Sequence, residues 1–305
     1  MIKPTELVYS SHDRCEFLHR HYIVDRALES PFNKSVFYLP LSSGSWGDQH
    51  YSAGTFSWYF DRFRAAGLVQ HDFYWSDDLR LQDAELFFQR IADCEVVILG
   101  GGSTVLGLER YGELGRRFYG DPDRFVRTLR ERQAKGMLTV GFSAGADQLC
   151  EHACSDPAIC YGLVRNVVVR LHFEHGVEGH VAGLAREYSD CLVFGLPNDS
   201  GLAVVNGSTP KGASWQLIEF VIDASWDKPE DQWHIRTRQG LRIEHRYRDG
   251  RDWQFNGGDL LLRVFSLNGH SEQTWIKPIH EEHWRNYETQ EPSAFLSAED
   301  IIQTL

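Results

Sequence analysis

Short apolar runs alternate with segments of helical periodicity along most of the chain. We expect strands at 35–41, 68–75, 95–99, 138–142, 163–173 and 192–197, with a hairpin arm at 202–205. Helices are predicted around the aromatic stripe at Phe56, Tyr59, Phe60 and Phe63, over 83–92, over 121–135 and around Arg186. This alternation predicts an α/β fold, in which a parallel sheet carries helices on both faces.

The two ends of the chain have a different pattern. Residues 1–34 show no clear period and are expected to form an irregular N-terminal extension before an α/β domain at 35–210. From about residue 211 strand patterns follow one another without helices, at 215–222, 233–238, 241–248 and 260–265. We therefore predict a β-rich C-terminal extension over 211–305.

The strand expected at 241–248 alternates apolar with charged residues, so that one face carries Arg242, Arg246 and Arg248 beside Glu244. Such charge is typical of an edge strand that is kept soluble. Two alternatives are a patch that binds a polyanion, such as an aspartate-rich polymer, and an interface in a homo-oligomer.

Composition and charge narrow the class of protein. Hydrophobic residues make up 42% and charged residues 24%, values typical of a soluble globular protein. The net charge of -12 argues against a nucleic-acid partner, because phosphate binding needs a basic face. No apolar run reaches the roughly 20 residues of a membrane span, and the first residues do not resemble a signal peptide. We expect a cytoplasmic protein whose six cysteines are reduced.

The first candidate for chemistry is the G-x-S-x-G motif that spans Gly141, Ser143 and Gly145. It follows an apolar run and precedes a helix-forming segment, which is the pattern of a nucleophile elbow. A serine hydroxyl is a weak nucleophile by itself, so such a site needs a histidine base. For the motif alone, the alternative is a tight glycine turn with a capping serine.

A second candidate is the run Gly100-Gly101-Gly102-Ser103-Thr104, which directly follows the strand at 95–99. Its backbone N–H groups are suited to a phosphate or to an oxyanion, but no Walker lysine follows. The oxyanion hole fits better if Ser143 is a nucleophile. Both motifs lie where parallel strands end, the usual place of function in such sheets.

Together with His172, which ends the run at 163–173, these motifs give the chain a resemblance to the family of aspartyl dipeptidase (dipeptidase E) and cyanophycinase. The resemblance runs from about residue 35 to 221 and rests on ordered blocks. These are the strand that runs into a proline at 36–40, 99–104 against G-G-G-N-T, 141–146 against G-x-S-A-G-A, 171–173 against P-H-F, and Arg186 at the family's distance from the histidine. It implies a flavodoxin-like fold related to class I glutamine amidotransferases, with serine in place of their cysteine.

The resemblance also implies roles for individual residues. Ser143 would be the nucleophile and His172 the base, and the N–H groups of Ala144 and of Gly101 or Gly102 would hold the oxyanion. Arg186 would pair with an acidic side chain of the substrate, either a small acidic peptide or an aspartate-rich polymer. No cofactor or metal is implied.

The chain departs from the family at the third member of the catalytic triad. Asn198 stands where the dipeptidase has the glutamate of G-L-P-E, and Asp199 follows it. An asparagine can orient an imidazole but stabilises its cationic form less than a carboxylate does. Asn198, Asp199 or Asp156 could fill the role, or the protein could be catalytically impaired.

Three other interpretations stay open. An α/β-hydrolase esterase would take its base from His270, His280 or His283 near the C-terminus. A catalytically inactive relative would act as a binding protein. Metal sites at His172, His175 and His180, or at Cys150, Cys154 and Cys160, are disfavoured by their spacing.

Overall fold

The computed structural model describes residues 3–13, 15–154, 158–174, 176–223, 243–267 and 272–305. The strands are β1 (Glu6–Tyr9), β2 (Ser35–Leu39), β3 (Val69–Asp72), β4 (Val96–Leu99), β5 (Leu138–Phe142), β6 (Val167–Leu171), β7 (Leu192–Leu196), β8 (Ser200–Ser208), β9 (Ser214–Ile222), β10 (Ile243–Arg246), β11 (Asp252–Phe255), β12 (Leu260–Phe265), β13 (Glu272–Lys277) and β14 (Arg285–Asn286). The helices are α1 (Glu16–Leu18), the π-helical η1 (His19–Val24), α2 (Asp25–Glu29), α3 (Trp46–Phe60), the 3-10 helix η2 (Asp61–Ala66), α4 (Leu81–Asp93), α5 (Thr104–Tyr119), α6 (Arg124–Gln133), α7 (Ala144–Leu149), α8 (Glu178–Glu187) and α9 (Ala298–Thr304).

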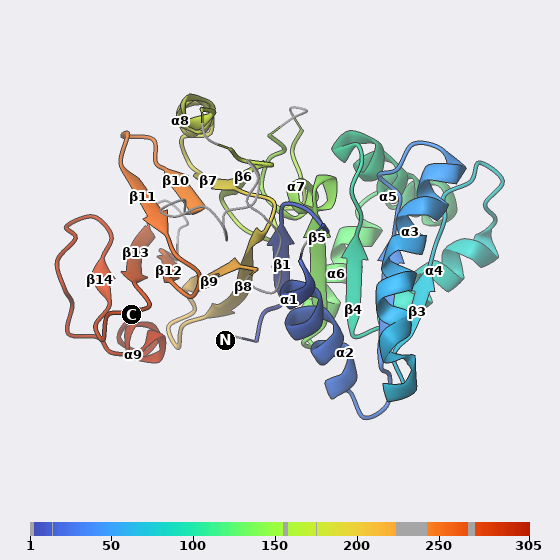
Figure 1. Cartoon of the computed structure of the whole chain (residues 1–305), viewed down its shortest axis with the longest axis horizontal. Coiled ribbons are helices and arrows are strands. Elements are labelled where there is room, and N and C mark those ends of the chain that lie inside the picture. The colour runs from blue at the N-terminus through green and yellow to red at the C-terminus, as the bar shows by residue number, and fades with distance from the viewer. Residues whose placement is uncertain (1–2, 14, 155–157, 175, 224–242, 268–271) are drawn as a thin grey trace.

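A ten-stranded mixed sheet runs through the length of the molecule (Figure 1). Its order is β14-β13-β12-β9-β8-β1-β5-β4-β2-β3, and a second sheet has the order β11-β10-β7-β6. β1, β5, β4, β2 and β3 are parallel, whereas β8, β9, β12, β13 and β14 pair in antiparallel fashion. The prediction of an α/β fold with a parallel sheet and a β-rich C-terminal part is therefore confirmed.

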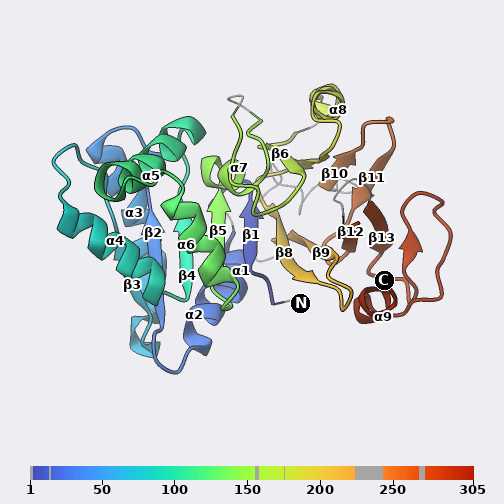
Figure 2. The ribbon, with the colours of Figure 1, turned by 180° about the vertical axis from the view of Figure 1, so that it is seen from behind.

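Helices cover both faces of the parallel strands. Side chains along a strand alternate between its two faces, so a strand that is apolar throughout presents apolar side chains on both. In β2, Val36 and Tyr38 belong to the same apolar core as Phe56 of α3. Phe37, from the same strand, belongs to the opposite core with Phe125 of α6. Accordingly, α3 lies in front of the sheet in Figure 1, and α4, α5 and α6 lie in front in the reverse view of Figure 2.

The expectation that residues 1–34 are irregular is wrong. Residues 6–9 form β1, which lies inside the sheet between β5 and β8, and all four of its residues are buried. The segment that follows β1 forms α1, η1 and α2 against the sheet. β1 is short and carries Glu6, so its sequence alone gives no clear alternation. The sheet also continues across residue 210, since β8 pairs with β9 along its whole length.

Two helix predictions need correction. The helix α5 follows directly after the glycine run and was not predicted. The next helix, α6, begins at Arg124 after the N-cap residue Asp123, rather than at residue 121. Glycines at 107, 112 and 115 lower the helix propensity of α5, and burial of Tyr111 and Leu114 against the sheet offsets that cost.

The basic strand is not an edge strand, because β10 lies between β7 and β11. Its charges also have partners: Arg246 pairs with Asp252 and Glu244, and Arg248 lies 3.9 Å from Asp190. Two parts of this prediction lie outside the described residues: the strand at 233–238, and the first two residues of the basic strand, 241 and the arginine at 242. In the described part of the basic strand, less unpaired positive charge is therefore available to a polyanion than the sequence suggests.

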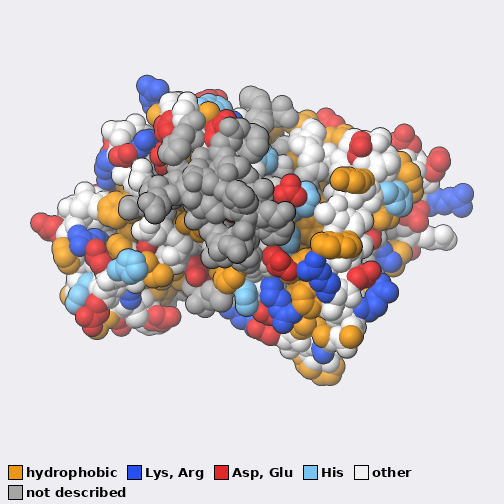
Figure 3. All heavy atoms as spheres, in the orientation of Figure 1, with side chains coloured by type: hydrophobic (Ala, Val, Ile, Leu, Met, Phe, Trp, Pro, Cys, Tyr) orange, Lys and Arg blue, Asp and Glu red, His pale blue; other side chains and the backbone are white. Residues whose placement is uncertain are grey.

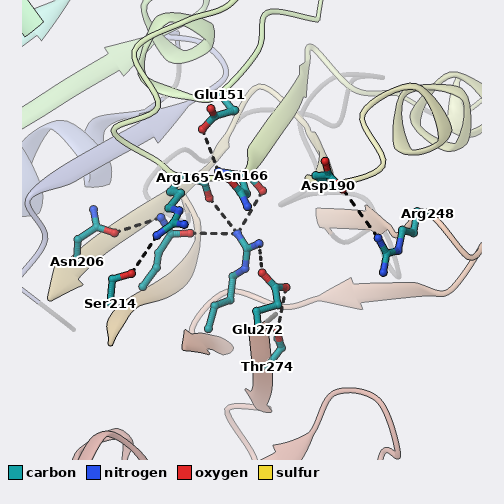
Figure 4. Close-up of polar contacts among 11 residues, drawn as sticks. Glu151, Arg165, Asn166, Asp190, Asn206, Ser214, Arg248, Glu272 and Thr274 are labelled. Carbon is teal, nitrogen blue, oxygen red and sulfur yellow. Dashed lines mark hydrogen bonds and ion pairs between the residues drawn. The ribbon is translucent and has the colours of Figure 1, made fainter. Parts of the chain in front are cut away.

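A buried arginine fastens the C-terminal strands to the second sheet. Arg263 of β12 donates to the carbonyl oxygens of Arg165 and Asn166, just before β6, at 3.0 and 3.2 Å. It also pairs with Glu272 of β13 at 2.6 Å (Figure 4).

Within the described ranges, no helix is both long and apolar enough to cross a lipid bilayer.

Candidate active site

Ser143 occupies the sharp turn between β5 and α7. Its backbone has φ 50° and ψ −123°, a conformation that an L-residue holds only when its surroundings enforce it. Its N–H donates to the carbonyl oxygen of Tyr9 at the end of β1. The turn is closely packed: a methyl group added at Gly145 would lie 2.1 Å from the carbonyl oxygen of Leu99. Glycine is therefore required at this position, and the serine is presented at the carboxyl end of the sheet.

The glycine run after β4 lies against Ser143. A methyl group added at Gly101 would lie 3.2 Å from Ser143 Cβ and 3.5 Å from its Oγ. Gly102 has φ 132° and leaves no room for a side chain, because a Cβ there would lie 2.1 Å from the carbonyl oxygen of Ser42. Among the described residues, no backbone carbonyl oxygen accepts a hydrogen bond from the N–H of Gly101 or Gly102. These donors therefore remain available next to the serine hydroxyl.

His172 follows β6 directly and contacts Asn198, which follows β7. The two atoms His172 Nδ1 and Asn198 Oδ1 are 2.6 Å apart. An amide oxygen only accepts hydrogen bonds, so Nδ1 carries the proton in this arrangement and Nε2 keeps its lone pair. The backbone of His172 is also strained, with φ 51°. The imidazole is thus exposed, oriented and able to accept a proton at Nε2.

The end of β1 and the segment that follows it connect these groups. Tyr9 accepts from the N–H of Ser143, and Oγ of the next residue, Ser10, accepts from the N–H of His172 at 2.7 Å. The thiol of Cys15 donates to the carbonyl oxygen of Asn198 at 3.4 Å. Burial raises the pKa of Cys15, which keeps the thiol protonated as a donor. Backbone or side-chain atoms of this N-terminal segment therefore contact all three candidate residues.

A buried polar network supports α7 behind the serine. Thr104 Oγ1 donates to Asp147 at 3.2 Å, and Gln148 Nε2 donates to the hydroxyl of Ser42 at 2.9 Å. These contacts join α7, the start of α5 and the loop after β2. Because each polar group lies in a buried region, the network fixes the relative position of the glycine run and the serine.

The remaining predicted residues lie as follows. Ala144 is buried as the first residue of α7, next to Ser143. Asp199 is buried, and its carbonyl oxygen accepts from the N–H of Asp223. Arg186 is exposed on α8, where its Nε donates to the carbonyl oxygen of Ala182. Asp156 and His175 lie outside the described residues. Of the described candidates for the third triad position, Asn198 is the one whose side chain contacts the His172 imidazole.

The structure also bears on the alternative sites. His280 and His283 lie between β13 and β14, and β13 is separated from β5 by β12, β9, β8 and β1. At about 4.8 Å per strand, this corresponds to roughly 24 Å across the sheet. His270 lies outside the described residues. Among the described residues, no group of three histidine, cysteine or acidic side chains is placed to hold a metal ion.

Sequence reasoning missed the contribution of Tyr9, Ser10 and Cys15. The only local signal was the apolar run at 7–9 that ends in two serines, which resembles the other strands entering this edge of the sheet. Its partners β5 and β8 come much later in the chain, so the pairing is not visible locally.

Comparison with known proteins adds information on the fold. No protein-family profile and no curated protein sequence matches the chain. Among solved structures, the chain resembles the crystal structure of a peptidase from an acI-B1 Actinobacterium, with 14% sequence identity and a TM-score of 0.51. The similarity covers 82% of this chain and 96% of that chain. At this identity the likeness concerns the fold.

Proposed function

We propose that this protein is a serine hydrolase that cleaves peptide bonds, as do dipeptidase E and cyanophycinase. The observation that carries the proposal is that Ser143 and His172 form hydrogen bonds with the adjacent residues Tyr9 and Ser10, where β1, β5 and β6 end. The peptidase whose fold this chain shares supports the same class of reaction.

In the proposed mechanism, Ser143 Oγ attacks the carbonyl carbon of the scissile bond while His172 Nε2 takes its proton. The N–H groups of Ala144 and of Gly101 or Gly102 stabilise the oxyanion that forms. Collapse of this intermediate leaves an acyl group on Ser143, and His172 returns the proton to the departing amine. Water then releases the acyl group by the reverse sequence. Asn198 orients the imidazole throughout.

The preference for an acidic residue beside the scissile bond is part of the proposal and depends on Arg186. Its exposed position on α8 leaves the guanidinium accessible to a carboxylate of a small peptide or of an aspartate-rich polymer. An Arg186→Ala variant is then expected to raise KM for peptides that contain aspartate more than for their alanine counterparts.

Labelling with a fluorophosphonate probe tests the serine mechanism. We expect wild type and the control His180→Ala, which alters an exposed histidine of α8, to be labelled, and Ser143→Ala and His172→Ala to lose labelling. Labelling that persists in folded Ser143→Ala protein would contradict the proposal. Absence of labelling in folded wild type would favour the second candidate, a catalytically impaired relative that binds peptides, for which Asn198 in place of a carboxylate is the supporting observation.

A further inference from the structure

A hollow of about 200 Å³ lies between the segment that follows β1 and the C-terminal part of α3. Its walls come from the segment after β1, from α3 and from the start of η2, and they include His12, Phe56, Trp58, Tyr59 and Arg62. In Figure 3, hydrophobic side chains and Lys or Arg side chains gather on this face of the molecule between α1 and α3.

Aromatic contacts place the hollow close to the candidate nucleophile. The ring of His12 lies 5.3 Å from the ring of Phe142, and Phe56 lies at the same distance from Phe142 on another side. Phe142 is the residue directly before Ser143. Two wall residues of the hollow therefore pack against the residue that directly precedes the serine.

The chemistry of the walls favours an apolar occupant. Phe56, Trp58 and Tyr59 supply aromatic surface, and Trp58 is 68% exposed. Burial lowers the pKa of His19, which also lines the hollow, to about 3, so this ring is neutral. The Arg62 guanidinium lies over Trp58 at 4.4 Å and pairs with Glu16 at 2.9 Å. Its charge is thus matched by Glu16 within the wall, and the other lining carboxylate, Asp13, lies 3.5 Å from His12.

We propose that this hollow is a specificity pocket that receives a bulky aromatic or aliphatic side chain of the peptide substrate, near the scissile bond. The inference rests on the proposed peptidase function and adds a second determinant to the acidic residue assigned to Arg186. An apolar side chain that enters the hollow leaves water and covers the exposed indole of Trp58.

The test compares kcat/KM for peptides that carry phenylalanine or glycine at each position around the scissile bond. We expect one position at which phenylalanine is favoured by about 10- to 100-fold, the range typical of apolar pockets. Trp58→Ala should reduce this ratio, and Thr55→Trp, which fills the hollow, should abolish it. Tyr51→Ala is the matched control, because Tyr51 is an exposed aromatic residue of α3 outside the hollow. Since the readout is a ratio of two substrates, it cancels changes in the reactivity of Ser143.

The proposal would be overturned if the phenylalanine-to-glycine ratio of kcat/KM changed in neither Trp58→Ala nor Thr55→Trp. A preference for lysine at that position would also overturn it. Failure of the peptidase function itself is recognised separately, by absence of fluorophosphonate labelling in folded wild type. In that case, binding of the phenylalanine and glycine peptides to Ser143→Ala protein decides. Saturable binding that needs phenylalanine and is lost in Thr55→Trp supports the pocket, and equal or absent binding of the two peptides refutes it.

Discussion

His172 Nδ1 and Asn198 Oδ1 lie 2.6 Å apart, so an uncharged amide orients the imidazole that we assign as the base. The amide holds one tautomer and one ring orientation, as a carboxylate does in a Ser-His-Asp triad, but it adds no negative charge. In the proposed mechanism, Asn198 therefore supplies the orienting function of a third triad member without its charge stabilisation.

Substitution of Asn198 tests this separation. We expect Asn198→Ala to slow labelling by a fluorophosphonate about 10- to 100-fold, because the imidazole loses its orienting partner. Asn198→Asp should retain activity and move the acid limb of the pH profile to higher pH, since a carboxylate favours the imidazolium. An Asn198→Ala variant with wild-type rates would show that another group orients His172.

Ser10 provides a second test, because its hydroxyl accepts from the backbone N–H of His172 and is itself fully buried. Ser10→Ala leaves that N–H without its partner, which we expect to cost about 1–3 kcal/mol of folding free energy. The labelling rate should fall at the same time, as the strained backbone of His172 relaxes. Ser11→Ala is the matched control, because Ser11 Oγ accepts from Asp13 instead. Equal effects of the two substitutions would argue against a positioning role for Ser10.

Three of the parallel strands could be predicted because each is a mainly apolar run that is buried on both faces. β2, β4 and β5 are examples, and their glycine and serine motifs fall directly after them. β1 could not be predicted in the same way, since its burial depends on β5 and β8 rather than on local periodicity. Strand pairing between distant segments is a tertiary effect, and β propensity depends strongly on such context.

The candidate site shows the same difference between local sequence patterns and contacts between distant segments. Ser143, the glycine run and His172 were found because each ends a recognisable strand. Their relative positions could not be predicted from the sequence, because they depend on Tyr9 and Ser10, which lie in a segment without clear periodicity. The basic strand shows the converse case, where a clear sequence pattern suggested a free charged face. Its partners Asp190 and Asp252 lie outside that strand and became visible only in the fold.

The tight turn around Ser143 predicts a large effect of a small substitution. Gly145→Ala would place a methyl group 2.1 Å from the carbonyl oxygen of Leu99, so strand or helix must shift. We expect a loss of about 1–3 kcal/mol in unfolding free energy and a marked loss of labelling. Gly54→Ala is the control, because a methyl group there meets no atom within 4 Å and Gly54 lies within α3. That variant should be as stable as wild type or up to about 1 kcal/mol more stable. Urea denaturation measures both.

Arg263 predicts how strongly the C-terminal strands are attached. Arg263→Met removes the partner of Glu272 and leaves the carbonyl oxygens of Arg165 and Asn166 without their donor. Breaking a buried pair in this way typically costs about 3–5 kcal/mol. Arg64→Met, which breaks an exposed pair with Asp61, should cost less than about 1 kcal/mol. If the two variants unfold at the same urea concentration, the buried arginine contributes no more than a surface one.

Glu6 predicts the pH dependence of stability. It is buried in β1, and burial raises the pKa of its carboxyl group from 4.5 to about 8, although Thr5 and Asn206 donate to it. In the unfolded chain the group ionises near pH 4.5, whereas in the folded protein it stays protonated up to about pH 8. The folded state therefore binds more protons between these values, and its stability falls by about 1.4 kcal/mol per pH unit as pH rises. Glu6→Gln should remove this slope and be more stable than wild type at pH 8, whereas Glu85→Gln, at an exposed position of α4, should keep it. Urea unfolding at pH 5 and pH 8 measures the difference, and a wild-type slope equal to that of Glu6→Gln would show that Glu6 is ionised in the folded protein.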